Sequence, residues 1–135
     1  SGVLGETTFF SNLTKEQKQQ FFRRISVLSV PAMYGEAFGL YLLEAWAASV
    51  PVVQPPAAAF PELIQATGGG RIAQSASPDS LADAIEELLS DESKRAATGR
   101  SARIAIEARF TLPAMARQIA ETFSRVAPIK VPLQA

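Results

Sequence analysis

The sequence predicts an α/β protein with a Rossmann-like parallel sheet and helices on both faces. Short apolar, β-branched segments alternate along the chain with segments of helical periodicity, an order typical of parallel sheets with crossover helices. The stretch YGEAFGLYLLEAWAASVPVVQP, residues 34–55, shows this order as a turn, a helix and a strand. Three strand-like segments are few for a complete doubly wound sheet. We therefore expect the chain to be one part of a larger protein.

The first half of the chain is expected to alternate between helices and strands. The expected elements are a helix over 14–25, a strand over 25–31, a helix over 39–49, a strand over 51–56, a helix over 60–67 and a strand over 71–74. Thr14 and Gln17 form a capping-box pattern that opens the first helix. The strand segments are apolar and β-branched, which predicts that they are buried. The glycine run 68–70 is expected to end the third helix.

The second half is expected to be helical. Ser77, Pro78 and Asp79 combine a cap, a first-turn proline and a first-turn acid, which predicts a helix start. Its predicted apolar face consists of Leu81, Ala84, Ile85, Leu88 and Leu89. A further helix is expected over 91–109. Thr111 is expected to cap a last helix with Met115, Ile119 and Phe123 pointing inward, and residues 128–135 to form a tail outside the domain at 1–127.

Composition excludes several classes of function. The 135 residues carry 13 Lys and Arg against 13 Asp and Glu, so no basic footprint for nucleic acid is present. The chain has neither histidine nor cysteine, which excludes histidine-based catalytic triads, thiolate chemistry and the usual zinc sites within it. Neither a signal peptide nor an apolar run of membrane-spanning length is evident. A cytoplasmic protein is expected, with no indication of membrane association in this segment.

Glu36 and Glu44 are the candidate site residues. Glu36 lies in the loop after an expected strand, where ligands of open α/β sheets collect, and the amides of Phe38, Gly39 and Leu40 at the following helix start would suit an anion. Glu44, two turns further, has the chemistry to bind a vicinal diol such as a ribose. The layout suits a sugar nucleotide with its diphosphate on the amides. The alternative is that both carboxylates are merely solvated, with Glu44 on the wet edge of its helix.

Three other features have simpler interpretations. The glycine run 68–70 follows a helix and precedes a strand, which favours a helix end over a phosphate cradle. The cations of residues 94–109 are expected to form a solvated face balanced by acids of the preceding helix. The phenylalanines at 9, 10, 21 and 22 are interpreted as core, or else as surface left bare without a partner domain.

The sequence also resembles a known family. The pattern Glu-x-Phe-Gly, then Leu-Leu-Glu-Ala with seven residues between the glutamates, then Pro-Val-Val, is similar to the signature of the retaining GT-B glycosyltransferases, the group 1 glycosyl transferases. The segments FPELIQATGGGRI, SPDSLADAIEELLSD, KRAATGRSAR and EARFTLPAMA continue the likeness, which covers residues 4–123. The resemblance implies the C-terminal, donor-binding half of a GT-B fold, truncated at its N-terminus, with the acceptor-binding domain missing.

The resemblance assigns roles to the same residues. Glu36 would be the catalytic residue that contacts the donor sugar, Glu44 would bind the ribose, and the amides of Phe38, Gly39 and Leu40 would hold the diphosphate. The implied reaction transfers a sugar from a nucleotide sugar to an acceptor hydroxyl with retention, without a metal or other cofactor. The isolated fragment is expected to be inactive, and neither the nucleotide, the sugar, the acceptor nor the oligomeric state follows from the sequence.

Departures from the family pattern leave an alternative open. Ser49 stands where the family usually has glycine, and Ala58 and Ala59 stand where a glycine pair is common. The basic residues that neutralise the diphosphate in the family precede this segment. A non-catalytic Rossmann-like interaction module that has lost its ligand therefore remains an alternative. A signalling receiver domain is disfavoured because the expected strand ends lack clustered aspartates.

Overall fold

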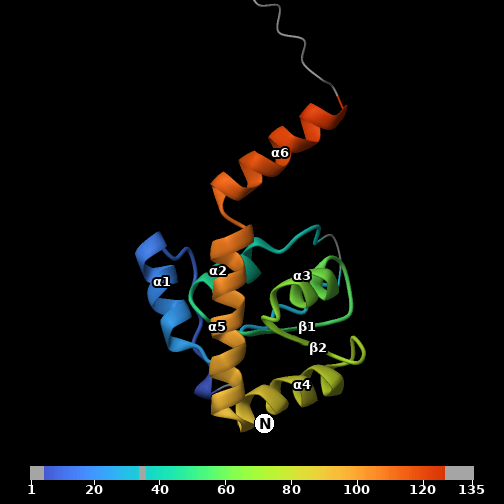
Figure 1. Ribbon diagram of the computed structural model, residues 1–135. Coiled ribbons are helices and arrows are strands. Elements are labelled where there is room, and N and C mark those ends of the chain that lie inside the picture. The colour runs from blue at the N-terminus through green and yellow to red at the C-terminus, as the bar shows by residue number, and fades with distance from the viewer. Residues whose placement is uncertain (1–4, 34–35, 127–135) are drawn as a thin grey trace, which may run out of the picture.

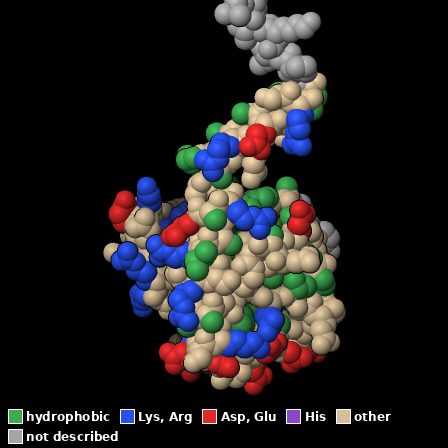
Figure 2. Space-filling model, viewed as in Figure 1, with side chains coloured by type: hydrophobic (Ala, Val, Ile, Leu, Met, Phe, Trp, Pro, Cys, Tyr) green, Lys and Arg blue, Asp and Glu red, His purple; other side chains and the backbone are tan. Residues whose placement is uncertain are grey.

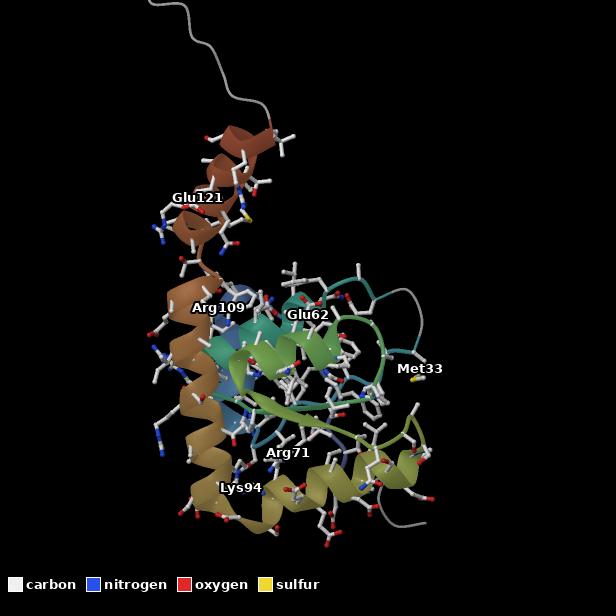
Figure 3. The ribbon with its side chains drawn as sticks, turned by 45° about the vertical axis from the view of Figure 1, so that its right-hand side comes forward. Met33, Glu62, Arg71, Lys94, Arg109 and Glu121 are labelled. Carbon is white, nitrogen blue, oxygen red and sulfur yellow. The ribbon has the colours of Figure 1, made fainter. Side chains whose placement is uncertain are left out.

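The computed structural model describes residues 5–33 and 36–126 as a small parallel sheet surrounded by helices (Figure 1). The elements are α1 (Lys15–Arg24), α2 (Leu40–Ala47), β1 (Val52–Gln54), α3 (Phe60–Thr67), β2 (Gly70–Ile72), α4 (Pro78–Ser90), α5 (Glu92–Arg109) and α6 (Leu112–Val126). Strands β1 and β2 pair in parallel, with Val52 opposite Gly70 and Gln54 opposite Ile72. Helices α3 and α4 lie on opposite sides of these strands (Figures 1 and 3). The predicted Rossmann-like α/β class is confirmed. Tyr34, Gly35 and the expected tail at 128–135 lie outside the described residues.

The expected strand over 25–31 is wrong as a regular strand. Leu28 forms one isolated parallel bridge with Val52, through the bonds Leu28 N to Pro51 O (3.0 Å) and Val53 N to Leu28 O (2.9 Å). Two residues later, the Val30 amide donates to the side-chain Oε1 of Gln54 at 3.2 Å instead of to a backbone carbonyl of β1. This side-chain bond takes the place of the next backbone hydrogen bond between the two segments, so residues 25–31 run beside β1 without extending the sheet. None of these residues is buried, and Ser26 and Pro31 are exposed, because nothing in the described chain pairs with the outer edge of the segment.

Local capping signals are confirmed at several helix starts and ends. Thr14 and Gln17 form a reciprocal capping box at α1, with bonds of 3.3 and 2.9 Å. Ser77 caps α4 by accepting the Ser80 amide, and Asp91 caps α5 in the same way. Gly68 ends α3 in the left-handed region at φ 63°, which confirms the helix-end interpretation of the glycine run.

The core is centred on Trp46 of α2. The indole is fully buried, and its Nε1–H donates to the Gly69 carbonyl at 2.8 Å, which ties α2 to the turn before β2. Gly69 has no room for a side chain because a Cβ would overlap the indole. Helix α5 packs alongside, and a Cβ at Gly99 would overlap the Ser49 carbonyl oxygen. The close approach of α5 to the end of α2 therefore requires glycine at position 99.

The cations near α5 have structural partners. Lys94 Nζ and Arg71 Nη2 both contact Glu87 Oε1, at 2.6 and 3.0 Å, and Figure 3 shows these two cations at the α4 end of α5. Arg95 donates to the last carbonyls of α4, and Arg109 donates to the Ala66 carbonyl at 2.9 Å. The predicted balance between α5 cations and α4 acids is thereby confirmed for Lys94.

Helix α6 projects from the body (Figure 1), and its predicted inward face is wrong. Thr111 does cap the helix, since its Oγ1 accepts the Ala114 amide at 3.4 Å. Met115, Ile119 and Phe123 are about half exposed or more, because only the first turn of α6, at Ala114, is buried against the body. The apolar periodicity correctly identified residues that share one face of α6, but no described element covers that face.

The predicted burial of the N-terminal phenylalanines and of the apolar face of α4 is confirmed only in part. Phe22 is buried in the core and Phe21 packs against it, whereas Phe9 is 84% exposed and Phe10 is 52% exposed. The Phe10 and Phe21 rings meet edge to face at 5.8 Å. On the predicted α4 face only Leu88 is fully buried, and Leu89 is exposed. Aromatic surface is therefore left bare at the N-terminal side.

Candidate functional site

Helix α2 begins at a glycine in the left-handed region. Gly39 occupies the N-cap position with φ 79° and is buried. A Cβ at this position would lie 3.2 Å from the Phe60 ring and 3.4 Å from the Tyr41 ring. Conformation and space therefore both require glycine here. The turn places the amides of Phe38, Gly39 and Leu40 at the start of α2, as the sequence predicted.

The Glu36 carboxylate holds the turn that leads into α2, whose N-cap residue Gly39 has no side-chain cap. Its Oε1 accepts the Gly39 N–H at 2.7 Å and the Phe38 N–H at 3.1 Å. A negative charge at a helix N-terminus is stabilised by the helix dipole, so the contact is favourable. Two of the three amides expected to suit an anion are therefore occupied by a carboxylate of the chain itself. Among the described residues, none accepts a bond from the Leu40 amide.

Tyr41 packs over the same turn. Its side chain is half-buried, and its buried hydroxyl oxygen makes no hydrogen bond of good geometry with the described residues. Burial raises the pKa of Tyr41, and the charge of the nearby Glu36 carboxylate and hydrogen bonding to it raise the pKa further, so the phenol stays neutral.

Glu44 lies one turn into α2 and has a partner in α1. Lys18 Nζ contacts Glu44 Oε1 at 2.5 Å, and both side chains are a little over 40% exposed. The two residues are 26 positions apart, so no local pattern in the sequence predicts the pair. Glu44 is thus at the surface, as its alternative interpretation held, but it is engaged rather than merely solvated.

A cleft of about 920 Å³ lies between α1 and α2. It is lined by Leu13, Lys15, Lys18, Gln19, Phe22, Arg23, Glu44, Ala47, Ala48 and Arg103. Figure 2 shows Lys and Arg side chains gathered over α1 and along α5, and acidic side chains over α4. Of the five predicted site residues, all of them described, Glu44 lines the cleft and the other four do not. The structure therefore places Glu44 in the cationic cleft and the other four predicted residues at the turn before and at the start of α2, outside the lining of that cleft.

Comparison with known proteins identifies the family. The family model for glycosyl transferases group 1 matches residues 2–105, more than half of the chain. The chain belongs to the group 1 glycosyltransferase family. One relative of this glycosyltransferase chain is the D-inositol 3-phosphate glycosyltransferase of Corynebacterium aurimucosum, 28% identical over 97% of this chain and 31% of the relative. Another is the GDP-mannose-dependent alpha-(1-6)-phosphatidylinositol monomannoside mannosyltransferase of Mycobacterium tuberculosis, 29% identical over 89% of this chain and 33% of the relative.

Solved structures agree with this assignment. The sucrose-phosphate synthase of Thermosynechococcus elongatus matches with a TM-score of 0.75 and 26% identity, over 93% of this chain and 33% of that one. HepE of Anabaena, solved in complex with UDP-glucose, matches with a TM-score of 0.69 and 27% identity, over 82% of this chain and 30% of that one. The glycosyltransferase chain spans about a third of the length of these relatives.

The predicted departures from the family pattern have a conformational consequence. Ser49 has φ 61° and ends α2 in a Schellman motif, in which Val50 N donates to Ala45 O and Ser49 N to Trp46 O, both at 2.9 Å. Ala58 has φ 50°. Both positions therefore retain the left-handed backbone that glycine favours, although neither residue is glycine. The loop geometry is kept while its usual residue type is lost.

Within residues 5–33 and 36–126, no cluster of acidic, histidine or cysteine side chains has the makeup of a metal site. In that same part of the chain, no helix has the length and hydropathy required to cross a bilayer.

Proposed function

We propose that this chain is the donor-binding part of a retaining glycosyltransferase that transfers a sugar from a nucleoside diphosphate to an acceptor hydroxyl. The observation that carries the proposal is the turn at Gly39, φ 79°, which brings the Phe38, Gly39 and Leu40 amides to the start of α2 beside the Glu36 carboxylate. A helix start with an adjoining carboxylate offers donors for a diphosphate and an acceptor for sugar hydroxyls. The UDP-glucose complex of HepE and the GDP-mannose dependence named for the mycobacterial relative support a nucleotide sugar as the ligand.

The proposed roles follow from the chemistry of each group. The amides of Phe38, Gly39 and Leu40 hold the diphosphate, and Glu36 accepts hydrogen bonds from hydroxyls of the donor sugar. Glu44 accepts from the ribose hydroxyls at the mouth of the cationic cleft. Because Lys18 contacts one oxygen of Glu44, the second oxygen is the one that a diol would approach first.

Catalysis in this proposal depends on positioning and on charge stabilisation. The acceptor hydroxyl attacks the anomeric carbon on the face of the leaving group, and the departing diphosphate takes up its proton. Helix-terminal amides aimed at the diphosphate lower the free energy of the charge that develops on it. Glu36 orients the sugar, so that its removal lowers the rate through lost alignment. The nucleotide sugar is the substrate, and no further cofactor enters this scheme.

The remaining parts of the proposal concern the whole protein. A second, acceptor-binding domain of the same polypeptide faces this one, and the isolated segment 1–135 does not transfer sugar by itself. The reaction takes place in the cytoplasm. Residues 1–127 act as the donor domain, with 128–135 as a tail.

The experiment titrates the full-length protein with UDP-glucose and with GDP-mannose, and calorimetry measures the binding of each donor. Binding of one donor is expected, with Glu36→Ala lowering the transfer rate at least about a hundredfold through lost orientation. Glu62→Ala is the matched control, since Glu62 is an exposed acid in the first turn of the next helix, α3 (Figure 3). Absence of binding to any nucleotide sugar, or equal rates for Glu36→Ala and Glu62→Ala, would overturn the proposal.

One observation favours a second candidate, a non-catalytic module that has kept the fold and lost the ligand. Both site carboxylates already have partners within the chain, Glu36 on the amides of the turn before α2 and Glu44 on Lys18. In this case the carboxylates stabilise the fold only. If this second candidate is correct, Glu36→Ala lowers the thermal midpoint and leaves sugar transfer by the full-length protein unchanged.

A further inference from the structure

The start of α2 presents a conflict between two anions. The proposed function places a diphosphate on the Phe38 and Gly39 amides, yet Glu36 Oε1 already accepts both of these N–H groups. A carboxylate and a diphosphate cannot share the same donors, because like charges at hydrogen-bonding distance repel strongly. When a donor binds, the Glu36 carboxylate must leave the amides and find other hydrogen-bond donors.

One buried hydroxyl lies beside Glu36. The Tyr41 hydroxyl oxygen forms no hydrogen bond of good geometry with any described residue, although the Glu36 carboxylate lies near enough to raise its pKa by hydrogen bonding. An unpaired buried hydroxyl destabilises a fold, so a protein that retains one needs an explanation for it. The ring is fixed in place, since it packs against the core and lies 3.4 Å from where a Cβ of Gly39 would stand. Its pKa is raised by burial and by the Glu36 charge, so it remains a hydrogen-bond donor.

We propose that Tyr41 is a positioning residue for Glu36, whose carboxylate transfers from the Phe38 and Gly39 amides to the Tyr41 hydroxyl when the donor diphosphate occupies those amides. Without a donor, Glu36 holds the Phe38 and Gly39 amides and makes no hydrogen bond of good geometry with the hydroxyl. With a donor, the diphosphate occupies these amides, and Tyr41 holds Glu36 with an oxygen turned toward the sugar. This inference rests on the proposed function.

Two single variants and their combination test it in the full-length protein. Tyr41→Phe removes only the hydroxyl, and it is expected to weaken binding of UDP or GDP, whichever the wild type binds, about tenfold, because the displaced carboxylate loses a charge-assisted hydrogen bond. The thermal midpoint of unliganded Tyr41→Phe is expected to equal or exceed that of the wild type, since an unpaired buried hydroxyl is removed. A purely structural role for Tyr41 would lower this midpoint instead.

The decisive readout is the dependence of the Tyr41 effect on Glu36. In a Glu36→Ala background no carboxylate has to move, so Tyr41→Phe should change nucleotide affinity by less than about twofold. In the matched Glu62→Ala background the tenfold loss should persist. An unchanged affinity in Tyr41→Phe, or the same tenfold loss with Glu36 absent, would overturn the inference while the proposed function stands. A wild type that binds neither nucleotide would remove the proposed function and this inference together.

Discussion

Ala58 provides a quantitative test of the loop that departs from the family pattern. Its φ of 50° lies in the left-handed region, which costs an L-residue about 1–2 kcal/mol. Glycine avoids this cost but loses about 0.5–1 kcal/mol more conformational entropy on folding. The side chain is exposed, so its removal sacrifices little packing. Ala58→Gly is therefore expected to stabilise the fold by about 0.5–1 kcal/mol.

The neighbouring alanine is the matched control. Ala57 does not have a positive φ, so Ala57→Gly should destabilise the fold by about the same amount. Unfolding entropy of about 2.1 cal/mol/K per residue over 135 residues gives about 0.28 kcal/mol/K. The thermal midpoint should thus rise by about 2–4 °C for Ala58→Gly and fall by a similar amount for Ala57→Gly, as followed by circular dichroism. A midpoint that falls in both variants would refute the assignment of backbone strain to Ala58.

Three further predictions concern contacts between elements. Gly99→Ala should destabilise the fold by more than about 2 kcal/mol in urea unfolding, since its methyl group would overlap the Ser49 carbonyl oxygen, and an unchanged midpoint would contradict this. The pKa of Glu87 is lowered from its ordinary value of 4.5 by the hydrogen bond from Lys94 and by neighbouring cations. The ion pairs of Glu87 therefore stabilise the fold above pH 4.5, and this stabilisation is lost as the pH falls and the carboxylate is protonated. The difference in thermal midpoint between wild type and Glu87→Gln should shrink toward acid pH, and a difference that stays constant with pH would contradict this prediction. Lys18→Met should lower the free energy of unfolding by less than about 1 kcal/mol, since its pair with Glu44 is exposed, and a larger loss would mean that the pair is shielded from solvent.

Features set by neighbouring residues in the sequence could be predicted, and features set by distant contacts could not. The caps at Thr14, Ser77 and Gly68 were predictable because the capping residue and the amide or carbonyl it serves lie within a few positions of each other. The irregular backbone over 25–31 could not be predicted, because the side chain of Gln54, 24 positions from Val30, accepts the Val30 N–H in place of a backbone carbonyl.

The same distinction applies to the candidate site. The turn at Glu36 and the glycine at 39 followed from the local sequence, and the structure confirms the helix start there. The contact of Glu36 with the turn amides is also local, since the carboxylate accepts from residues two and three positions later. The partnership of Lys18 with Glu44 and the burial of the Tyr41 hydroxyl depend on packing, which periodicity does not encode.

The contact of Glu36 with the Phe38 and Gly39 amides is compatible with a donor site for an electrostatic reason. The amides at the start of α2, reinforced by the helix dipole, stabilise whichever anion contacts them. A diphosphate carries more negative charge and more acceptor oxygens than a carboxylate, so the same field favours the diphosphate when it is present. Displacement of Glu36 then costs about one charge-assisted pair of hydrogen bonds, and a replacement donor such as Tyr41 recovers part of that free energy. An internal carboxylate that satisfies the amides in the absence of ligand keeps the turn folded, and it leaves the site ready for exchange.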